Sequence, residues 1–205
     1  MRGEHLRLNT KSLLALGLAI AVIGGAAAGA GFAIFGRGSA QAKQVTVRDQ
    51  HGAVLATSGP SDAIGEASAR LGFDLRVPSN FPTAAGTLVN VVADTGPAGV
   101  QGALHIGMLE FSDGTNTATA AALELYELPV RLDAPEGAAY DVGRSDLQVF
   151  ATGLGLPRES FTLLTKDRTF TAVFTNQLPP KSGLADFFLS LHPDVALSII
   201  PTTAK

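Results

Sequence analysis

Hydrophobic and polar residues alternate in several short runs of the chain, and this alternation predicts β-strands. The clearest case is the sequence SFTLLTKDRTFTAVF, where hydrophobic positions alternate on both sides of a turn at Lys166-Asp167. Because successive side chains of a strand point to opposite faces, such runs indicate a sheet with one buried face. Further strands are expected at 73–77, 88–93, 104–108, 117–128 and 147–151.

Two helices are expected, one before most of the strands and one after them. The first has Ser61 or Asp62 as its cap, Gly72 as its terminating residue, and one apolar face made by Ile64, Ala67 and Leu71. The second, with Ser182 as its cap, carries apolar residues at helical spacing, namely Leu184, Phe187, Phe188 and Leu191. The pattern therefore predicts an α+β fold in which an antiparallel sheet of about five or more strands packs with two helices.

A continuous apolar segment, residues 12–36, precedes these elements and carries no charged side chain. A helix that crosses a bilayer needs about 20 apolar residues, so the segment predicts one N-terminal transmembrane helix. We favour an uncleaved anchor in the lipid bilayer of the cell membrane, with the N-terminus inside and the following domain outside. The alternative is secretion after cleavage following Ala42, because residues 40–42 form an A-x-A site.

Glycines recur along this apolar segment. Small residues at helical spacing let two helices approach closely. A weak homodimer is one interpretation, and chance occurrence in an Ala/Gly-rich segment is the other. The face in question comprises Gly17, Gly24, Gly25, Gly29 and Gly31.

These patterns divide the chain into five parts. Residues 1–11 form a short cytoplasmic tail and residues 12–36 the anchor. Residues 37–60 form a linker with a short hairpin or strand character, and residues 61–192 form the extracytoplasmic domain. Residues 193–205 form a tail or an edge strand.

Two closely spaced prolines raise the question of what joins the first helix to the sheet. Proline fixes φ and restricts the preceding residue to extended conformations. We interpret the segment as a stiff joint that inserts one phenylalanine into the core. Its motif residues are Val77, Pro78, Ser79, Phe81 and Pro82.

Composition narrows the chemistry that the chain can perform. The chain has no cysteine, which excludes disulfides, thiolate metal sites and a cysteine nucleophile. The net charge of −3 and the absence of a basic cluster indicate no nucleic-acid partner. The histidines lie apart, at positions 5, 51, 105 and 192, so no metal site is expected.

The sequence contains no complete motif that is typical of a catalytic or cofactor site. The sequence contains no G-x-S-x-G elbow. Gly153-Leu154-Gly155 begins like a dinucleotide fingerprint but runs into Pro157. The carboxylates Glu110 and Asp113, and likewise Glu124 and Glu127, are interpreted as solvated groups beside turns. We therefore expect no enzyme activity, no catalytic residues and no cofactor.

A run that ends in V-P-S-x-F-P, a late hairpin with phenylalanines and a final amphipathic helix occur in this order along the chain. The residues of this pattern are Phe73, Val77, Pro78, Ser79, Phe81, Pro82, Phe170, Phe174, Phe187, Phe188, Ser190 and Leu191. The pattern resembles a bacterial family of unknown function, family 4367, over roughly residues 61–191. The resemblance implies a membrane-anchored extracytoplasmic domain, found behind the anchors of some anti-sigma factors, with an architecture similar to lipoprotein carriers and with no catalytic residues.

These sequence features are compatible with three hypotheses about function. The first is a non-catalytic domain that binds or modulates a protein partner at the cell envelope. The alternative is a carrier or sensor of a lipid or another apolar ligand in a pocket between sheet and helices. A hydrolase of uncharacterised type is the second alternative. The pocket of the carrier hypothesis would be lined by Phe161, Phe170, Phe174, Phe187 and Phe188.

Overall fold

The computed structural model describes residues 44–82, 86–96, 104–112, 121–135, 138–175 and 180–191. The apolar segment 12–36, its glycine face and the tail 193–205 lie outside these ranges. Within them, no helix is both long enough and apolar enough to cross a bilayer.

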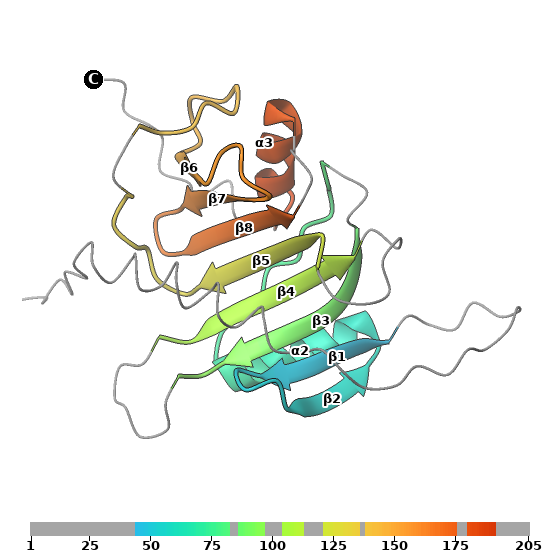
Figure 1. Ribbon diagram of the computed structural model, residues 1–205. Coiled ribbons are helices and arrows are strands. Elements are labelled where there is room, and N and C mark those ends of the chain that lie inside the picture. The colour runs from blue at the N-terminus through green and yellow to red at the C-terminus, as the bar shows by residue number, and fades with distance from the viewer. Residues whose placement is uncertain are drawn as a thin grey trace, which may run out of the picture.

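The described residues build an eight-stranded sheet (Figure 1). Its spatial order is β2-β1-β3-β4-β5-β8-β7-β6. The strand bounds, in chain order, are β1 (Val45–Asp49), β2 (Val54–Ser58), β3 (Thr87–Asp94), β4 (Ile106–Ser112), β5 (Leu123–Leu128), β6 (Val149–Thr152), β7 (Arg158–Leu164) and β8 (Thr169–Thr175).

The predicted fold class is wrong, because the sheet is mixed and larger than expected. β1 pairs in parallel with β3, with Val47 opposite Val91, whereas every other neighbouring pair is antiparallel. The hairpin of β1 and β2, which the sequence placed in a linker, continues the sheet beyond β3. The hydrophobic pattern identified its strand character but not its pairing partner, because pairing with β3 joins residues far apart along the chain.

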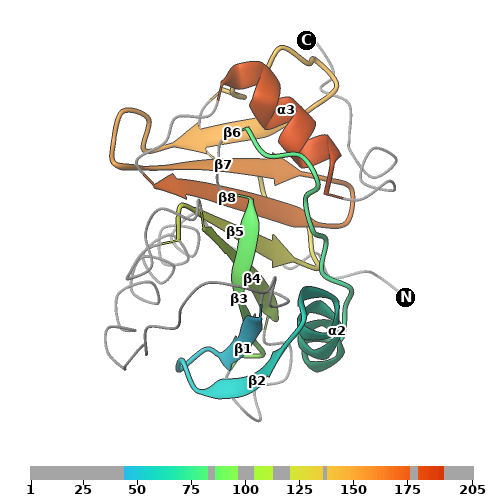
Figure 2. The same cartoon turned by 90° about the vertical axis from the view of Figure 1, so that its right-hand side faces the viewer.

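Both described helices lie on one face of the sheet (Figure 2). Helix α2 (Pro60–Leu71) lies beneath the β1 and β3 side and ends at Gly72, whose φ of 76° is left-handed. Helix α3 (Lys181–Leu189) lies beneath the other side. Neither predicted side-chain cap forms; the capping positions are Gly59 and Pro180. Pro60 explains the earlier start of α2, because proline is well suited to the first helical position.

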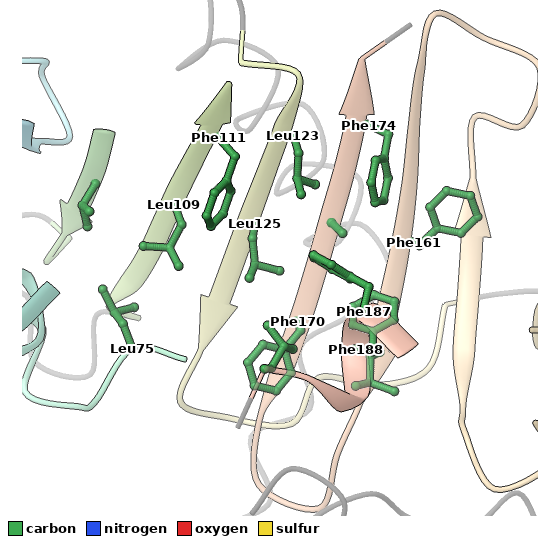
Figure 3. Packing of buried hydrophobic residues seen from close by; sticks show 14 of the residues in the cluster. Leu75, Leu109, Phe111, Leu123, Leu125, Phe161, Phe170, Phe174, Phe187 and Phe188 are labelled. Carbon is green, nitrogen blue, oxygen red and sulfur yellow. The ribbon is translucent and has the colours of Figure 1, made fainter. Parts of the chain in front are cut away.

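The core fills the space between the sheet and the helices. Phe111, Leu123 and Phe174 are register partners on β4, β5 and β8, and their side chains form a row on the helix-facing side of the sheet (Figure 3). Phe187 of α3 packs against this row, with its ring centroid 5.9 Å from that of Phe174. We call the helix-facing side the inner face and the opposite side the outer face.

Residues 73–77 differ from the expected strand, because the structure gives them no strand pairing. They run extended beneath the sheet, between α2 and α3 (Figure 2). Leu75 packs so closely onto β4 that a Cβ at Gly107 would lie 2.2 Å from Leu75 Cδ2. The alternation therefore reflects an extended segment packed against a sheet, which buries alternate side chains as a strand does.

Candidate functional site

A groove opens between the start of α2, the segment that contains the two prolines, and the adjoining ends of β3 and β4. Its volume is about 500 Å3, within the range of about 300–1,000 Å3 that is typical of small-molecule sites. The lining residues are mostly apolar, and none of them carries a titratable side chain: Pro60, Ser61, Ile64, Val77, Pro78, Phe81, Gly86, Thr87, Leu88 and Phe111.

The segment Val77–Pro82 forms one wall of this groove and is fixed to α3 by two contacts. The Ser190 hydroxyl accepts hydrogen bonds from the backbone N–H groups of Ser79 (3.1 Å) and Asn80 (2.9 Å). Gly183 lets Pro82 approach the helix, because a Cβ at that glycine would lie 2.9 Å from Pro82 Cβ. The wall is therefore held in place by contacts with the second helix.

Phe81 connects the groove to the core. Its ring centroid lies 5.1 Å from that of Phe111, in an edge-to-face arrangement, and 6.0 Å from that of Phe187. Phe81 is half-buried, and it also lines the groove. One side of the ring thus completes the core while another side faces the cavity. The sequence interpretation of this segment as a stiff joint included the insertion of Phe81 into the core but not the groove that the segment lines.

The phenylalanines predicted to line a ligand pocket lie elsewhere. All five are almost completely buried, with exposed fractions of 0–1%. They pack against one another and against the sheet (Figure 3), and none of them lines the groove. The five residues are Phe161, Phe170, Phe174, Phe187 and Phe188.

Two carboxylates singled out in the sequence point to opposite faces of β5. Glu127 lies on the inner face, where it pairs with Arg168 and accepts a hydrogen bond from the Arg76 backbone N–H (2.7 Å). Burial raises the pKa of Glu127, and these hydrogen bonds and the Arg168 charge oppose the rise. The residue is 2% exposed, so its predicted solvated position differs from the observed one.

The outer face holds a second polar network around Glu124. This carboxylate lies opposite Glu110 of β4 in the sheet register. Its Oε2 accepts hydrogen bonds from the Tyr126 hydroxyl (2.7 Å) and from Arg158 (2.6 Å). Asn90 donates to Glu110 (2.8 Å). Glu124 is 6% exposed, so its predicted solvated position is also wrong, and its ion-pair partner Arg158 comes from another strand.

This network raises the pKa values of two of its members, Glu110 and Tyr126. Burial is the largest cause that raises the pKa of Glu110, and the nearby Glu124 charge adds to the rise, while the Asn90 hydrogen bond opposes it. Burial also raises the pKa of Tyr126, with further contributions from Glu124. The network therefore keeps Tyr126 as a hydroxyl donor and places Glu110 where its negative charge is disfavoured.

His51 and His105, the two histidines within the described ranges, make separate contacts, and His5 and His192 lie outside those ranges. His105 contacts the Leu71 carbonyl through Nδ1 at 2.8 Å, at the end of α2. His51 lies in the β1–β2 turn, where its backbone N–H donates to Asp49. Within the described ranges, no group of three or more histidine, aspartate or glutamate side chains is arranged to hold a metal ion.

Several groove residues had no signal in the sequence. Leu88 and Phe111 read as ordinary strand residues, and Ile64 as an ordinary position on the inner face of a helix. What brings them together is the register of β3 and β4, which places Leu88 opposite Phe111. Only the unusual proline spacing marked one wall of the groove in advance.

Comparisons of the chain with models of protein families, with curated proteins and with solved structures gave no match. The resemblance to family 4367 therefore stays a prediction from the sequence.

Proposed function

We propose that this protein is a non-catalytic binding domain of the cell envelope that takes an apolar chain of a lipid, such as a fatty acyl chain, in the groove beside Phe81. The observation that supports the proposal is the groove itself, about 500 Å3 in volume and lined without any titratable side chain. This places the proposed ligand site away from the buried phenylalanines named in the sequence analysis.

The chemistry of the lining favours a hydrocarbon chain over a polar ligand. Pro78 and Phe81 offer rigid apolar surface, and Ile64 and Leu88 add aliphatic contacts from the two sides. Transfer of apolar surface out of water contributes about 25 cal/mol per Å2, so a flexible chain gains affinity through area alone. The hydroxyls of Ser61 and Thr87 are the polar side-chain groups in the lining, which suits a ligand whose charged end stays in water.

The exposed groove residue Val77 can be substituted to test ligand binding in the groove. Val77 lines the groove and is 37% exposed, so an acidic substitution there places a charge in the ligand path without burying it in the core. Val54 on the edge strand β2 is 57% exposed and does not line the groove. The variants Val77→Asp and Val54→Asp form a matched pair with the same chemical change.

The experiment is photoaffinity labelling of the full chain with a fatty acid that carries a diazirine on its alkyl chain. We expect adducts within residues 60–64, 77–82 and 86–88, displaced by unlabelled fatty acid. Val77→Asp is expected to weaken labelling at these positions by about tenfold, which corresponds to 1.4 kcal/mol. Val54→Asp is expected to label as the wild type does.

Two results would contradict the proposal. Adducts confined to the apolar segment 12–36 would show that the probe reaches the chain only through the bilayer. Equal labelling of the groove in both variants would show that the contact does not depend on the proposed wall. Binding of a partner protein at the envelope stays a prediction from the sequence.

A further inference from the structure

Two leucines at the tip of the β6–β7 hairpin are exposed to solvent. Leu154 is 55% exposed and Leu156 is 63% exposed. The other large hydrophobic residues that are exposed within the described ranges are Val54 and Val77. A pair of long aliphatic side chains on one short turn is an apolar surface without a partner in the described structure.

The backbone holds this tip in one conformation. Gly153 and Gly155 have φ angles of 72° and 81°, in the left-handed region that glycine adopts readily. The Leu156 N–H donates to the Gly153 carbonyl at 3.0 Å and closes the turn. The Gly155 N–H donates to the Glu159 carboxylate at 2.6 Å, and Glu159 is 3% exposed. The leucines are therefore presented by a turn that is fixed from within the domain.

The sheet register places this tip at the same end of the strands as the entry of the chain from its N-terminal segment. The register joins Val45 to Ser58 at the start of β1, Thr87 to Ser112, and Arg158 to Thr175 at the start of β7. All of these pairs lie at one end of the sheet. The groove opens at this end too, since Thr87 and Leu88 line it.

The length of chain before β1 limits how far this end can lie from the apolar segment. Residues 37–44 connect residue 36 to Val45. A chain extends by at most about 3.3–3.6 Å per residue, so Val45 lies roughly 32 Å at most from residue 36. An apolar segment in the bilayer would therefore keep the start of β1 within this distance of the membrane, and the β6–β7 tip lies at the same end of the strands.

We propose that Leu154 and Leu156 contact the lipid bilayer and insert into its interfacial region. Apolar side chains gain free energy by entering the boundary between headgroups and acyl chains, and a fixed turn loses little entropy on doing so. The inference rests on the membrane anchor predicted from the sequence at residues 12–36 and on the proposed envelope function. Contact at this position would also turn the groove opening toward the bilayer, which is the source of its proposed ligand.

The chain contains no cysteine, so a single nitroxide label can be attached at any chosen position. The experiment uses the full chain in vesicles of phosphatidylethanolamine and phosphatidylglycerol, with the label at Leu154→Cys or at Val54→Cys. Val54 is a matched control, because it is as exposed as Leu154 but lies at the opposite end of the sheet, opposite Arg48. Accessibility to oxygen and to a water-soluble nickel chelate is measured by electron paramagnetic resonance.

We expect the oxygen-to-nickel accessibility ratio at position 154 to be several-fold higher than at position 54. Leu156→Gln in the chain labelled at 154 is expected to lower that ratio toward the value at position 54. Equal ratios at the two positions, in a chain that floats with the vesicles, would overturn the contact while leaving the groove proposal intact. A chain that does not float with the vesicles would overturn both the membrane attachment and the contact.

Discussion

Glu127 on β5 and Arg168 in the β7–β8 turn form an ion pair on the inner face of the sheet. Arg168 also donates to the Asp74 carbonyl at 2.8 Å and lies over the ring of Phe73, 5.7 Å from its centroid. The Arg76 backbone N–H donates to the same Glu127 carboxylate. One buried carboxylate thus joins the central strand, a distant hairpin turn and the segment that leads to the groove wall.

Removal of Arg168 leaves the Glu127 charge buried with weaker compensation. We expect Arg168→Met to lower the free energy of unfolding by about 3–5 kcal/mol, the usual range for breaking a buried pair. Chemical denaturation followed by circular dichroism measures this loss. The double variant with Glu127→Gln is expected to recover part of it. Arg70→Met, which breaks an ion pair about 40% exposed on both sides, is the control and should cost less than about 1 kcal/mol.

The Ser190 hydroxyl fixes the groove wall to α3. We expect Ser190→Ala to destabilise the fold by about 1 kcal/mol, because the two donors that it leaves are exposed and can turn to water. Hydrogen exchange at the amides of Ser79 and Asn80 should accelerate more than exchange in the sheet. Ser182→Ala, an exposed change at the other end of the same helix, serves as control. Unchanged protection at residues 79 and 80 would mean that the serine does not hold the wall.

Two helical glycines predict opposite effects of the same substitution. In α3, Gly183→Ala places a methyl group 2.9 Å from the Pro82 ring, and we expect a loss of about 1–3 kcal/mol, as overpacking typically produces. In α2, a Cβ at Gly65 meets nothing within 4 Å, so Gly65→Ala should stabilise by about 0.5–1 kcal/mol. Thermal unfolding of the two variants measures both signs. Equal shifts would contradict the close packing of Pro82 on α3.

Phe81 is half-buried, so its truncation should cost less than truncation of a core phenylalanine. We expect Phe81→Ala to destabilise by about 2 kcal/mol, near the value for partial loss of a buried aromatic side chain. Phe187→Ala, at a position that is fully buried, should cost about 3–5 kcal/mol. Denaturant unfolding compares the two. If both cost the same, Phe81 belongs to the core alone and not to the groove.

The raised pKa of Glu110 is expected to make the stability of the fold depend on pH. Its pKa in the folded state is raised above 4.5, chiefly by burial, so the folded protein binds this proton more tightly than the unfolded chain does. The stabilisation that comes from tighter proton binding at Glu110 is therefore complete below the pKa of Glu110 in the unfolded chain. It is lost as the pH rises through the pKa of Glu110 in the folded protein. We expect Glu110→Gln to be more stable than the wild type at neutral pH, with the difference disappearing below about pH 4.

An exposed aspartate provides the control with the opposite sign. The Arg144 hydrogen bond lowers the pKa of Asp146, so its contribution is present above the unfolded pKa and is lost as pH falls through the folded pKa. Asp146→Asn should therefore lower stability at neutral pH, by a small amount because the pair is exposed. Unfolding curves recorded across the acidic range measure both variants. Parallel pH profiles for Glu110→Gln and the wild type would contradict the disfavoured charge at Glu110.

Local patterns in the sequence predicted local structure well. The hairpin around Lys166-Asp167 forms as β7 and β8, and both helices occur close to their expected positions, with Gly72 ending α2 as expected. The alternation of residues 73–77 was misleading, because an extended segment packed under a sheet has the same period as a strand. Periodicity reports which side chains are buried, not which backbone groups are paired.

The properties that define the site depend on contacts between distant residues, which no local pattern encodes. The parallel pairing of β1 with β3 joins Val47 to Val91, and the groove requires Leu88, Val77 and Ile64 to meet from three separate segments. The burial of Glu124 and Glu127 on opposite faces likewise follows from partners contributed by other strands. The sequence marked the prolines, but the role of their segment as a groove wall depends on the hydrogen bonds of Ser79 and Asn80 to Ser190 and on the packing of Pro82 at Gly183.

The position of β1 within the sheet has a mechanical consequence. β1 follows the N-terminal segment directly, yet it is not an edge strand, because it pairs with β2 on one side and with β3 on the other. A pulling force applied before Val45 and directed along β1 would load both rows of hydrogen bonds in shear, so that they would have to break together instead of one after another.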